Sequence, residues 1–213
     1  MKIRHGMILA AGLGKRMQPL TNKKPKPLLE INGITLLERA INLLVNHGVK
    51  DIKVNIHHLG EQIEKFISDF KSEAKITISN EKDLLLDTGG GIKKGTKDFE
   101  NNPFFVINPD TFWSNKYSEE VQSLEKEYFT TKRPCLLLVK KELSLDNSFK
   151  GDFNLYNNLI SKDKQNKYIF TGLQIIKNDH LLFDKDIFSM NEVWEKLISE
   201  NNLGGLESNQ KFY

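Results

Sequence analysis

The sequence contains a single cysteine, Cys135, among its 213 residues. One thiol cannot form an intramolecular disulfide, and an unpaired cysteine inside the apolar run CLLLV is typical of a buried core position. The lack of a disulfide framework is usual for proteins of a reducing compartment. We therefore expect a cytoplasmic protein in which Cys135 is an ordinary core residue.

Long apolar segments are also missing. The apolar stretch near the N-terminus is short and is interrupted by Gly6, and no segment approaches about 18 apolar residues, so we predict neither a signal peptide nor a membrane span. Basic and acidic side chains nearly cancel, at 31 against 28, for a net charge of +3. This nearly even balance of charge does not indicate nucleic acid or an anionic membrane as a partner.

The first half of the chain alternates strand-like and helix-like patterns. Strands are predicted at 7–10, 51–57, 75–79 and 103–108, and helices at 35–47, 60–70 and 92–99. Gly48 is expected to end the first helix, and 80–91 is expected to be a loop ending in three glycines. Apolar strands separated by helices indicate a mostly parallel sheet covered on both faces.

The second half changes character. We predict a helix near 118–129, a strand at 134–140 and a helix near 190–200. Between them, short polar strands at 150–156 and 168–176 flank a polar turn, which indicates a small antiparallel insertion on the parallel core.

A glycine-rich stretch at residues 8–27, ILAAGLGKRMQPLTNKKPKP, suggests phosphate binding. A dinucleotide fingerprint, G-x-G-x-x-G, would need glycine where Met17 stands. A P-loop would need serine or threonine after Gly14-Lys15, where Arg16 stands, and a glycine five residues before Gly14. Both motifs are excluded.

What remains is a glycine turn with cationic side chains downstream. Gly12 and Gly14 allow the backbone to approach a ligand closely, and Arg16 can bind phosphate through its planar fork of donors. Lys26 lies between two prolines, which stiffen the backbone on both sides. A lysine held in this way suits a charge that must occupy one defined position.

The stretch LAAGLGKRMQPLTNKKPKPLLEING resembles the signature of the sugar-1-phosphate nucleotidyltransferases, or NDP-sugar pyrophosphorylases. Their pattern is L-A-x-G-x-G-x-R-x-x-P-L-T followed by P-K-P-L. LDTGGGIKKG, at 86–95, is similar to the second nucleotide segment of that family, and VINPDTFW, at 106–113, matches its strand-end aspartate. GLQII at 172–176 and FSMNEVWEKLI at 188–198 favour the branch of N-acetylmuramate-1-phosphate uridylyltransferases of cell-wall recycling.

The resemblance implies a fold and a reaction. The fold would be a Rossmann-like three-layer α/β domain over 1–213, with a nucleotide-binding half at about 1–115 and a sugar-binding half at 116–213. The reaction would join a nucleoside triphosphate to a sugar-1-phosphate, giving an NDP-sugar and pyrophosphate. Arg16 and Lys26 would be catalytic. The nucleotide would be bound by Ala10, Ala11, Gly12, Gly14, Glu81, Thr88, Gly89 and Gly90.

The resemblance further implies that Asp110 holds Mg²⁺, although Pro109 stands where the family usually has a small residue. Trp113 would either flank the sugar or only pack. A second metal ligand is expected in a W-x-[DH]-V-G-T-like segment beginning near Tyr213, so we expect the chain to be truncated or disordered there. The implied sugar-binding residues are Asn108, Gly151, Asn154, Thr171 and Gly172.

Several alternatives stay open at this point. UTP with N-acetylmuramic acid 1-phosphate is the leading substrate pair. Mannose-1-phosphate guanylyl transfer, glucose-1-phosphate thymidylyl or uridylyl transfer, and cytidylyl transfer to a phosphorylated alcohol are the others. A non-catalytic module that senses nucleotides would belong to a different class. The sequence does not indicate an oligomeric state.

Overall fold

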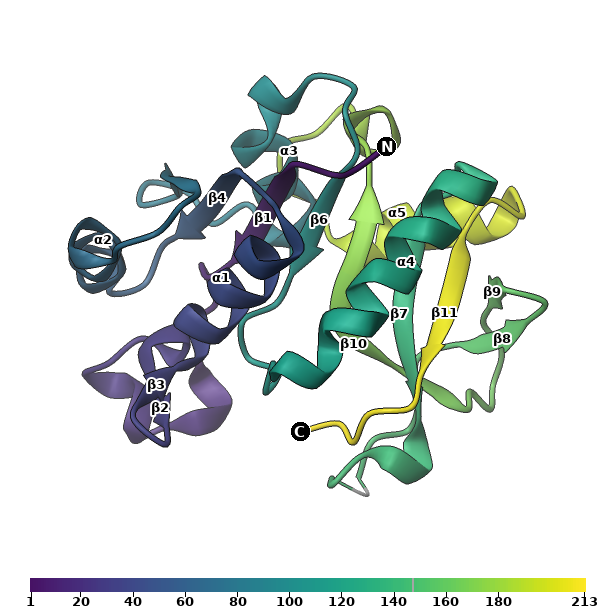
Figure 1. Ribbon diagram of the computed structural model, residues 1–213, viewed down its shortest axis with the longest axis horizontal. Helices are drawn as coiled ribbons and strands as arrows, with labels where there is room; N and C mark the ends of the chain where they lie inside the picture. Colours follow the sequence, from purple (N-terminus) through teal and green to yellow (C-terminus); the bar gives the residue numbers. More distant parts are fainter. Residues whose placement is uncertain (147) are drawn as a thin grey trace.

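A nine-stranded mixed sheet runs through the described part of the protein, residues 1–146 and 148–213 of the computed structural model (Figure 1). Its strand order is β5-β4-β1-β6-β10-β7-β11-β9-β8. The strands are β1 His5–Leu9, β4 Asp51–Ile56, β5 Lys75–Asn80, β6 Phe104–Ile107, β7 Cys135–Lys140, β8 Asn154–Tyr156, β9 Leu159–Ser161, β10 Tyr168–Ile176 and β11 Gly204–Ser208.

Parallel pairing joins β5, β4, β1 and β6, as the apolar runs of the first half predicted. All four residues of β6 are buried, because helices cover both sides of this part of the sheet. β7 and β11 also pair in parallel, whereas β10 lies antiparallel between β6 and β7. The predicted mostly parallel α/β fold is therefore confirmed.

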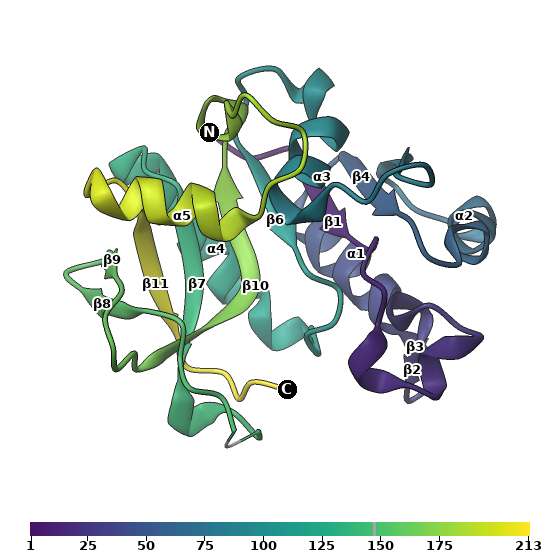
Figure 2. The same cartoon turned by 180° about the vertical axis from the view of Figure 1, so that it is seen from behind.

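Helices form the two outer layers. α1 (Leu36–His47), α2 (Gly60–Asp69) and α4 (Ser118–Thr131) contribute to one core, which faces the viewer in Figure 1. α3 (Asp87–Gly95) and α5 (Met190–Ser199) contribute to the second core on the opposite face, seen in Figure 2. In the described residues, no helix is long and apolar enough to cross a membrane.

Local signals explain where α1 begins and ends. The Thr35 hydroxyl accepts a hydrogen bond from the Glu38 backbone N–H at 3.0 Å, which caps the first turn. Gly48 adopts a φ of 104° and ends the helix as predicted, because this left-handed conformation disfavours residues with a Cβ.

One prediction about the sheet was wrong, and two further β elements were not predicted. The strand at 168–176 is the central strand β10, so the antiparallel insertion is the β8–β9 hairpin at the sheet edge instead. β11 was missed because its sequence GGLES lacks a strand-like apolar pattern; its pairing with β7 makes it a strand. A small hairpin of β2 (Glu30–Ile31) and β3 (Ile34–Thr35) was also not predicted.

The segment 80–91 is not the predicted loop throughout. Its three glycines lie inside helix α3, which starts at Asp87 rather than at residue 92. Glycine disfavours a helix on intrinsic propensity, so tertiary packing decides this assignment. A Cβ at Gly89 or Gly90 would overlap Phe188 or the carbonyl oxygen of Asp186, respectively. Glycine is needed here for close packing rather than for a turn.

Candidate active site

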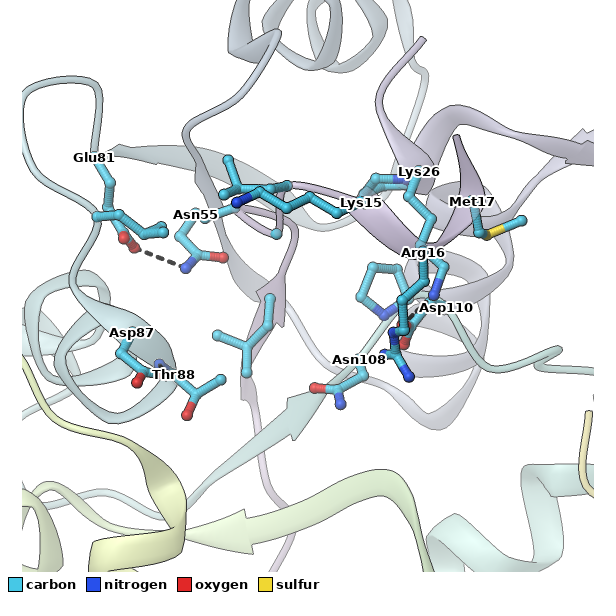
Figure 3. Close-up of a pocket in the computed structure, with 18 of the residues that line it drawn as sticks. Lys15, Arg16, Met17, Lys26, Asn55, Glu81, Asp87, Thr88, Asn108 and Asp110 are labelled. Atoms are coloured by element: carbon cyan, nitrogen blue, oxygen red, sulfur yellow. Dashed lines mark hydrogen bonds and ion pairs between the residues drawn. The ribbon is translucent and has the colours of Figure 1, made fainter. Parts of the chain in front are cut away.

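A cavity of about 650 Å³ opens where β1, β4 and β6 end. In a sheet of parallel strands, this carboxyl edge is where ligands bind. Its walls combine the glycine turn after β1, the loop before α3 and the segment after β6 (Figure 3). The predicted site residues that line it are Ala11, Gly12, Gly14, Arg16, Lys26, Glu81, Thr88, Asn108 and Asp110.

The two glycines of the turn serve different purposes. Gly14 has a φ of 63°, and a Cβ there would lie 3.0 Å from the Thr21 Cγ2 atom. The Thr21 hydroxyl donates to the Gly14 carbonyl oxygen at 2.8 Å, which holds the turn closed. A Cβ at Gly12 would meet no protein atom within 4 Å, so its backbone is open to a ligand in the cavity.

Two cationic side chains, Lys15 and Arg16, lie directly after Gly14 on a short 3₁₀ turn, Lys15–Met17. Arg16 is exposed and points toward Asn108 and Asp110, whereas Lys15 extends toward the opposite wall (Figure 3). Lys15 was not among the predicted site residues, although it lines the cavity next to Arg16. Two flexible cations at one rim suit a ligand with several phosphates.

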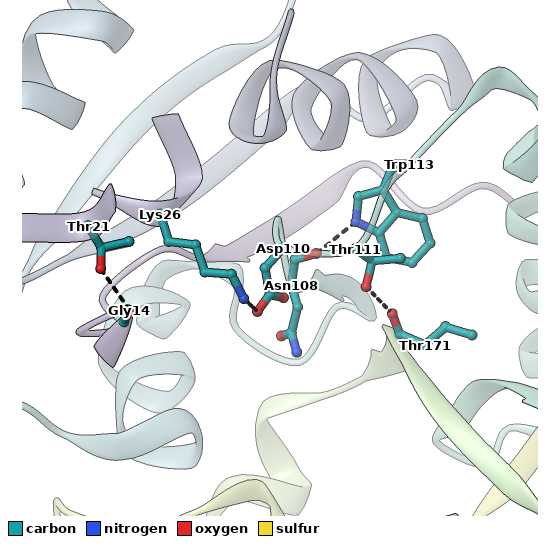
Figure 4. Close-up of polar contacts among 8 residues, drawn as sticks. All are labelled: Gly14, Thr21, Lys26, Asn108, Asp110, Thr111, Trp113 and Thr171. Carbon is teal, nitrogen blue, oxygen red and sulfur yellow. Dashed lines mark hydrogen bonds and ion pairs between the residues drawn. The ribbon is translucent and has the colours of Figure 1, made fainter. Parts of the chain in front are cut away.

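Lys26 occupies the first position of another 3₁₀ turn, Lys26–Leu28. Two backbone hydrogen bonds fix this turn, from Leu28 N–H to the Pro25 oxygen and from Leu29 N–H to the Lys26 oxygen. The Lys26 ammonium donates to Asp110 Oδ2 at 2.6 Å (Figure 4). The structure therefore brings together two residues that are 84 positions apart in the sequence.

The segment that carries Asp110 is held on both sides (Figure 4). The Trp113 indole N–H donates to the backbone carbonyl oxygen of Asn108 at 2.7 Å. The Thr111 hydroxyl donates to the backbone carbonyl oxygen of Thr171 at 2.7 Å. Trp113 is 1% exposed and packs edge-on against Tyr117, so it is a core residue rather than a flank of the cavity. Burial raises the pKa of Tyr117 to about 12, which keeps this phenol neutral.

A buried polar network forms the wall opposite Lys26. The Asn55 amide donates to Glu81 Oε1 at 2.7 Å and accepts from the Ala10 N–H at 2.8 Å. Glu81 Oε2 accepts from the Leu86 N–H at 3.1 Å. Asn55 was not predicted, although a polar residue at the carboxyl end of an alternating strand is a signal that could have found it.

Several residues predicted to bind the nucleotide are buried, and their backbone N–H groups are hydrogen-bonded within the protein. Gly89 and Gly90 do not line the cavity, and both of their N–H groups donate to the Phe188 oxygen, at 2.9 and 3.1 Å. These two N–H groups at the start of α3 therefore already have an acceptor within the protein and are unavailable to an anion. Ala10 is likewise 2% exposed, with its N–H bound by Asn55.

The residues predicted to bind the sugar likewise fall into two groups, those that line the cavity and those that do not. Asn108 lines the cavity, but Thr171 is 1% exposed and donates to the Leu137 oxygen, and Gly172 lies behind Asn108. Direct contact by Thr171 or Gly172 is therefore not supported, because the wall of the cavity covers them. The Asn154 amide is bound within its own loop, by Asp163 and Asn166.

Gly151 lines a second hollow of about 220 Å³. Phe153, Phe170 and Trp194 contribute aromatic surface to it. Phe170 is two residues before Gly172 on β10, and Gly172 accepts a hydrogen bond from the cavity residue Asn108 at 2.8 Å. Strand β10 therefore connects a residue of the hollow to the wall of the main cavity.

The carboxylates of Asp110 and Asp87 line the main cavity, besides the buried Glu81. Among residues 1–146 and 148–213, no three His, Cys, Asp or Glu side chains gather closely enough to form a metal centre of their own. Mg²⁺ commonly binds through one or two carboxylates together with substrate phosphates and water. Asp110, 37% exposed and in contact with the cationic Lys26, fits that mode of binding.

A glycine turn, three cations and a strand-end carboxylate around one cavity are typical of a protein that handles phosphorylated ligands. The model of the family described as Nucleotidyl transferase matches residues 5–142. The chain belongs to this nucleotidyl transferase family, and its near-full-length relatives are sugar-1-phosphate nucleotidyltransferases.

Two relatives align over nearly the whole chain. One is the N-acetylmuramate alpha-1-phosphate uridylyltransferase of Caulobacter vibrioides, 30% identical over 94% of this chain and 86% of its own length. Another is the D-glycero-alpha-D-manno-heptose 1-phosphate guanylyltransferase of Campylobacter jejuni, 30% identical over 92% of this chain and 83% of its own length.

Solved structures share the fold. A UDP-glucose pyrophosphorylase complexed with UDP-glucose superposes with a TM-score of 0.80, covering 99% of this chain and 92% of that chain at 16% identity. HddC from Yersinia pseudotuberculosis, complexed with GMP-PN, gives a TM-score of 0.76 over 99% and 92% of the two chains at 23% identity.

Proposed function

We propose that this protein is a Mg²⁺-dependent enzyme that transfers a nucleotidyl group from a nucleoside triphosphate to a sugar-1-phosphate. UTP and N-acetylmuramic acid 1-phosphate are the leading substrate pair. The observation that carries the proposal is the 2.6 Å contact of Lys26 with Asp110 in a cavity that Arg16 and the open backbone of Gly12 also line.

The reaction needs positioning and charge neutralisation more than covalent help from the protein. A phosphate oxygen of the sugar-1-phosphate attacks the α-phosphorus and forms a new P–O bond. The bond between the α-phosphorus and the bridging oxygen breaks, and pyrophosphate leaves with that electron pair. No oxidant or further reactant is required.

Each cation has a separate role in this proposal. Arg16 binds the β- and γ-phosphates and neutralises the departing pyrophosphate through its planar fork of donors. Lys26 neutralises the α-phosphate and the incoming sugar phosphate, where negative charge concentrates during transfer. To do so, the Lys26 ammonium exchanges part of its contact with Asp110 for phosphate oxygens.

Asp110 would hold Mg²⁺, with phosphate oxygens and water as the remaining ligands. The ion would supply positive charge that offsets the negative charge of the phosphates. The release of Asp110 from Lys26 on nucleotide binding would free a carboxylate for this purpose.

The choice of substrates rests on the relatives. The uridylyltransferase of Caulobacter vibrioides matches nearly the full chain, and a second N-acetylmuramate alpha-1-phosphate uridylyltransferase, from Neisseria meningitidis, is 36% identical over 55% of it. A guanylyl transfer is the second candidate, because the heptose 1-phosphate guanylyltransferase aligns over a similar share.

The sugar would extend from Asn108 toward the second hollow, where Gly151 lies beside aromatic side chains. Aromatic faces give a sugar apolar contact area, and neighbouring polar groups give it hydrogen bonds. In this arrangement, residues up to about 115 mainly hold the nucleotide and later residues mainly hold the sugar.

A pyrophosphate-release assay tests the proposal, with UTP, GTP, dTTP and CTP each paired with several sugar-1-phosphates. We expect turnover that requires Mg²⁺ and is fastest with UTP and N-acetylmuramic acid 1-phosphate. Fastest turnover with GTP would support the second candidate. Binding of nucleotide without product from any pair would indicate a sensing module and contradict the proposal.

A further inference from the structure

Asn55 and Glu81 form a buried pair within the wall of the cavity, Asn55 in β4 and Glu81 directly after β5. Asn55 is 3% exposed and Glu81 is 1% exposed. The contact is visible in Figure 3. Gly91 leaves the room for it, because a Cβ there would lie 2.7 Å from Glu81 Oε1 and 2.8 Å from Asn55 Nδ2.

Both oxygens of Glu81 are used within the protein. Oε1 accepts from the Asn55 amide at 2.7 Å, and Oε2 accepts from the Leu86 N–H at 3.1 Å. Asn55 Oδ1 accepts from the Ala10 N–H at 2.8 Å, so both ends of this amide are used as well. The pair thus joins the backbone of Ala10 to the backbone of Leu86.

These two backbone positions stand directly next to the ligand-facing residues. Ala11 and Gly12 follow Ala10, and Asp87 and Thr88 follow Leu86. A change in the Asn55–Glu81 contact would therefore shift the two walls of the nucleotide end of the cavity relative to each other.

We propose that Asn55 and Glu81 are positioning residues that set the geometry of the nucleotide subsite, and that Glu81 does not itself read the base. This inference rests on the proposed function, because it assumes that a nucleoside triphosphate occupies the cavity. It replaces the expectation that Glu81 is a direct nucleotide contact.

Exchange of the two functional groups tests the proposal at constant net charge. In Asn55→Asp, a second carboxylate faces Glu81; in Glu81→Gln, the new amide must point its N–H₂ at either the Asn55 amide or the Leu86 N–H. Each single variant therefore leaves a buried mismatch. In the double variant N55D/E81Q, the amide introduced at position 81 donates to the carboxylate introduced at position 55. The oxygen of that amide accepts from the Leu86 N–H, so every partner is satisfied again.

Kinetics and calorimetry measure the effect of each variant. We expect the KM and the calorimetric Kd for the nucleoside triphosphate to rise about tenfold or more in either single variant, the effect of one unsatisfied buried group. The KM for the sugar-1-phosphate should stay within about threefold of the wild-type value, since its part of the cavity is not joined to this pair. The double variant should recover both the melting temperature and the affinity for nucleotide.

Asn178→Asp is a matched control on the opposite edge of the sheet. The Asn178 amide donates to the Thr96 and Glu100 oxygens at 2.8 and 2.9 Å, away from the cavity. It should lower the melting temperature without changing the affinity for nucleotide. A purely structural role of Asn55 and Glu81 would give the same pattern in their single variants.

Three results would overturn the inference. The first is a double variant that recovers its melting temperature but not its affinity for nucleotide, since Glu81 would then touch the ligand. The second is unchanged affinity in folded single variants. If the single variants do not fold, the double variant is compared directly with wild type, and weak binding at a normal melting temperature contradicts the inference. The third is a wild-type protein that binds no nucleotide, a result that also contradicts the proposed function. Nucleotide binding without turnover, in contrast, contradicts the proposed function but not this inference.

Discussion

The ion pair of Lys26 and Asp110 should contribute little to stability, whereas the proposed function gives it a large part in catalysis. Their side chains are 23% and 37% exposed, and exposed ion pairs contribute about 0–1 kcal/mol to folding. In the proposed reaction, the same charges would act on phosphates within a partly enclosed cavity, where a developing charge is stabilised far more strongly. The two effects can therefore be separated by experiment.

Replacement of Lys26 by methionine keeps much of the side-chain length and removes the charge. We expect kcat/KM to fall by about 10²- to 10³-fold while the melting temperature changes little. Lys24→Met is the control, because Lys24 forms a similar ion pair with Glu30, at 2.7 Å, on the neighbouring surface. Equal losses in both variants would argue against a specific role for Lys26.

Replacement of Asp110 by asparagine tests the proposed Mg²⁺ site. The amide is a weaker ligand for a hard cation, so we expect half-maximal turnover to need about tenfold more Mg²⁺ or more. Asp87→Asn is the comparison, since Asp87 is an exposed carboxylate of the same cavity. A shift of the Mg²⁺ requirement in Asp87→Asn alone would move the proposed site to Asp87.

The residue types of the candidate site could be predicted better than their contacts. Gly12, Gly14, Arg16, Lys26 and Asp110 follow a pattern in the sequence, and all of them line the cavity. Asn55 belongs to no such motif; its position near the end of a strand could have indicated it, but its contact with Glu81 depends on the pairing of β4 with β5. Thr171 and Gly172 lie next to the site in space but behind its wall, and chain position alone does not tell front from back.

At the scale of elements, helix α3 depends on close packing of its glycines. Gly89 and Gly90 lie against the chain at 186–188, and their N–H groups bind the Phe188 oxygen. The Met190 N–H donates to the Thr88 hydroxyl at 2.8 Å, next to the start of α5. The glycines thus join the base of the cavity to the segment that begins α5.

Gly90→Ala should disrupt this contact. The new methyl group would overlap the backbone oxygen of Asp186, so we expect the free energy of unfolding to fall by about 1–3 kcal/mol despite the better helix propensity of alanine. Gly95→Ala is the control in the same helix, because a Cβ there would meet no backbone atom among its nearest contacts: the end of the Met7 side chain lies 3.0 Å away and the Ser79 Cβ 3.4 Å away. Urea titrations compare the two, and a stable Gly90→Ala protein would contradict the packing argument.

At the scale of the whole molecule, two partly buried histidines make stability depend on pH. Burial lowers the pKa of His47 below its ordinary 6.5, against the opposing effect of Glu125, and burial also lowers the pKa of His180. As pH falls through about 6.5, the unfolded chain therefore takes up protons before the folded chain does. Stability should be highest above that pH and should fall toward the lower folded-state pKa values.

Melting temperatures between pH 8 and pH 5.5 measure this effect. We expect a decrease across that range, and a smaller decrease in the variant with both His47→Gln and His180→Gln. The carboxylates with lowered pKa values, such as Asp98 and Glu207, contribute only at lower pH. An unchanged slope in the double variant would assign the pH dependence to other groups.

The continuous sheet also predicts cooperative unfolding. Trp113 belongs to the core on one face of the sheet, and Trp194 belongs to the core on the other. In each single-tryptophan variant, Trp113→Phe or Trp194→Phe, the fluorescence of the remaining tryptophan should change at the same urea concentration as the circular dichroism. Separate transitions would show that the two faces unfold independently.

The sequence by itself determined the parallel first half of the sheet, α1 with its Gly48 cap, and the chemical nature of the glycine, cationic and acidic residues that line the cavity. These features depend on local patterns: apolar periodicity, capping residues and a motif of adjacent side chains. Only the tertiary structure decided that the strand at 168–176 lies in the centre of the sheet and that three glycines form a helix. It also decided that Lys26 meets Asp110 and that Asn55 meets Glu81, because each of these depends on packing between segments that are distant in the chain.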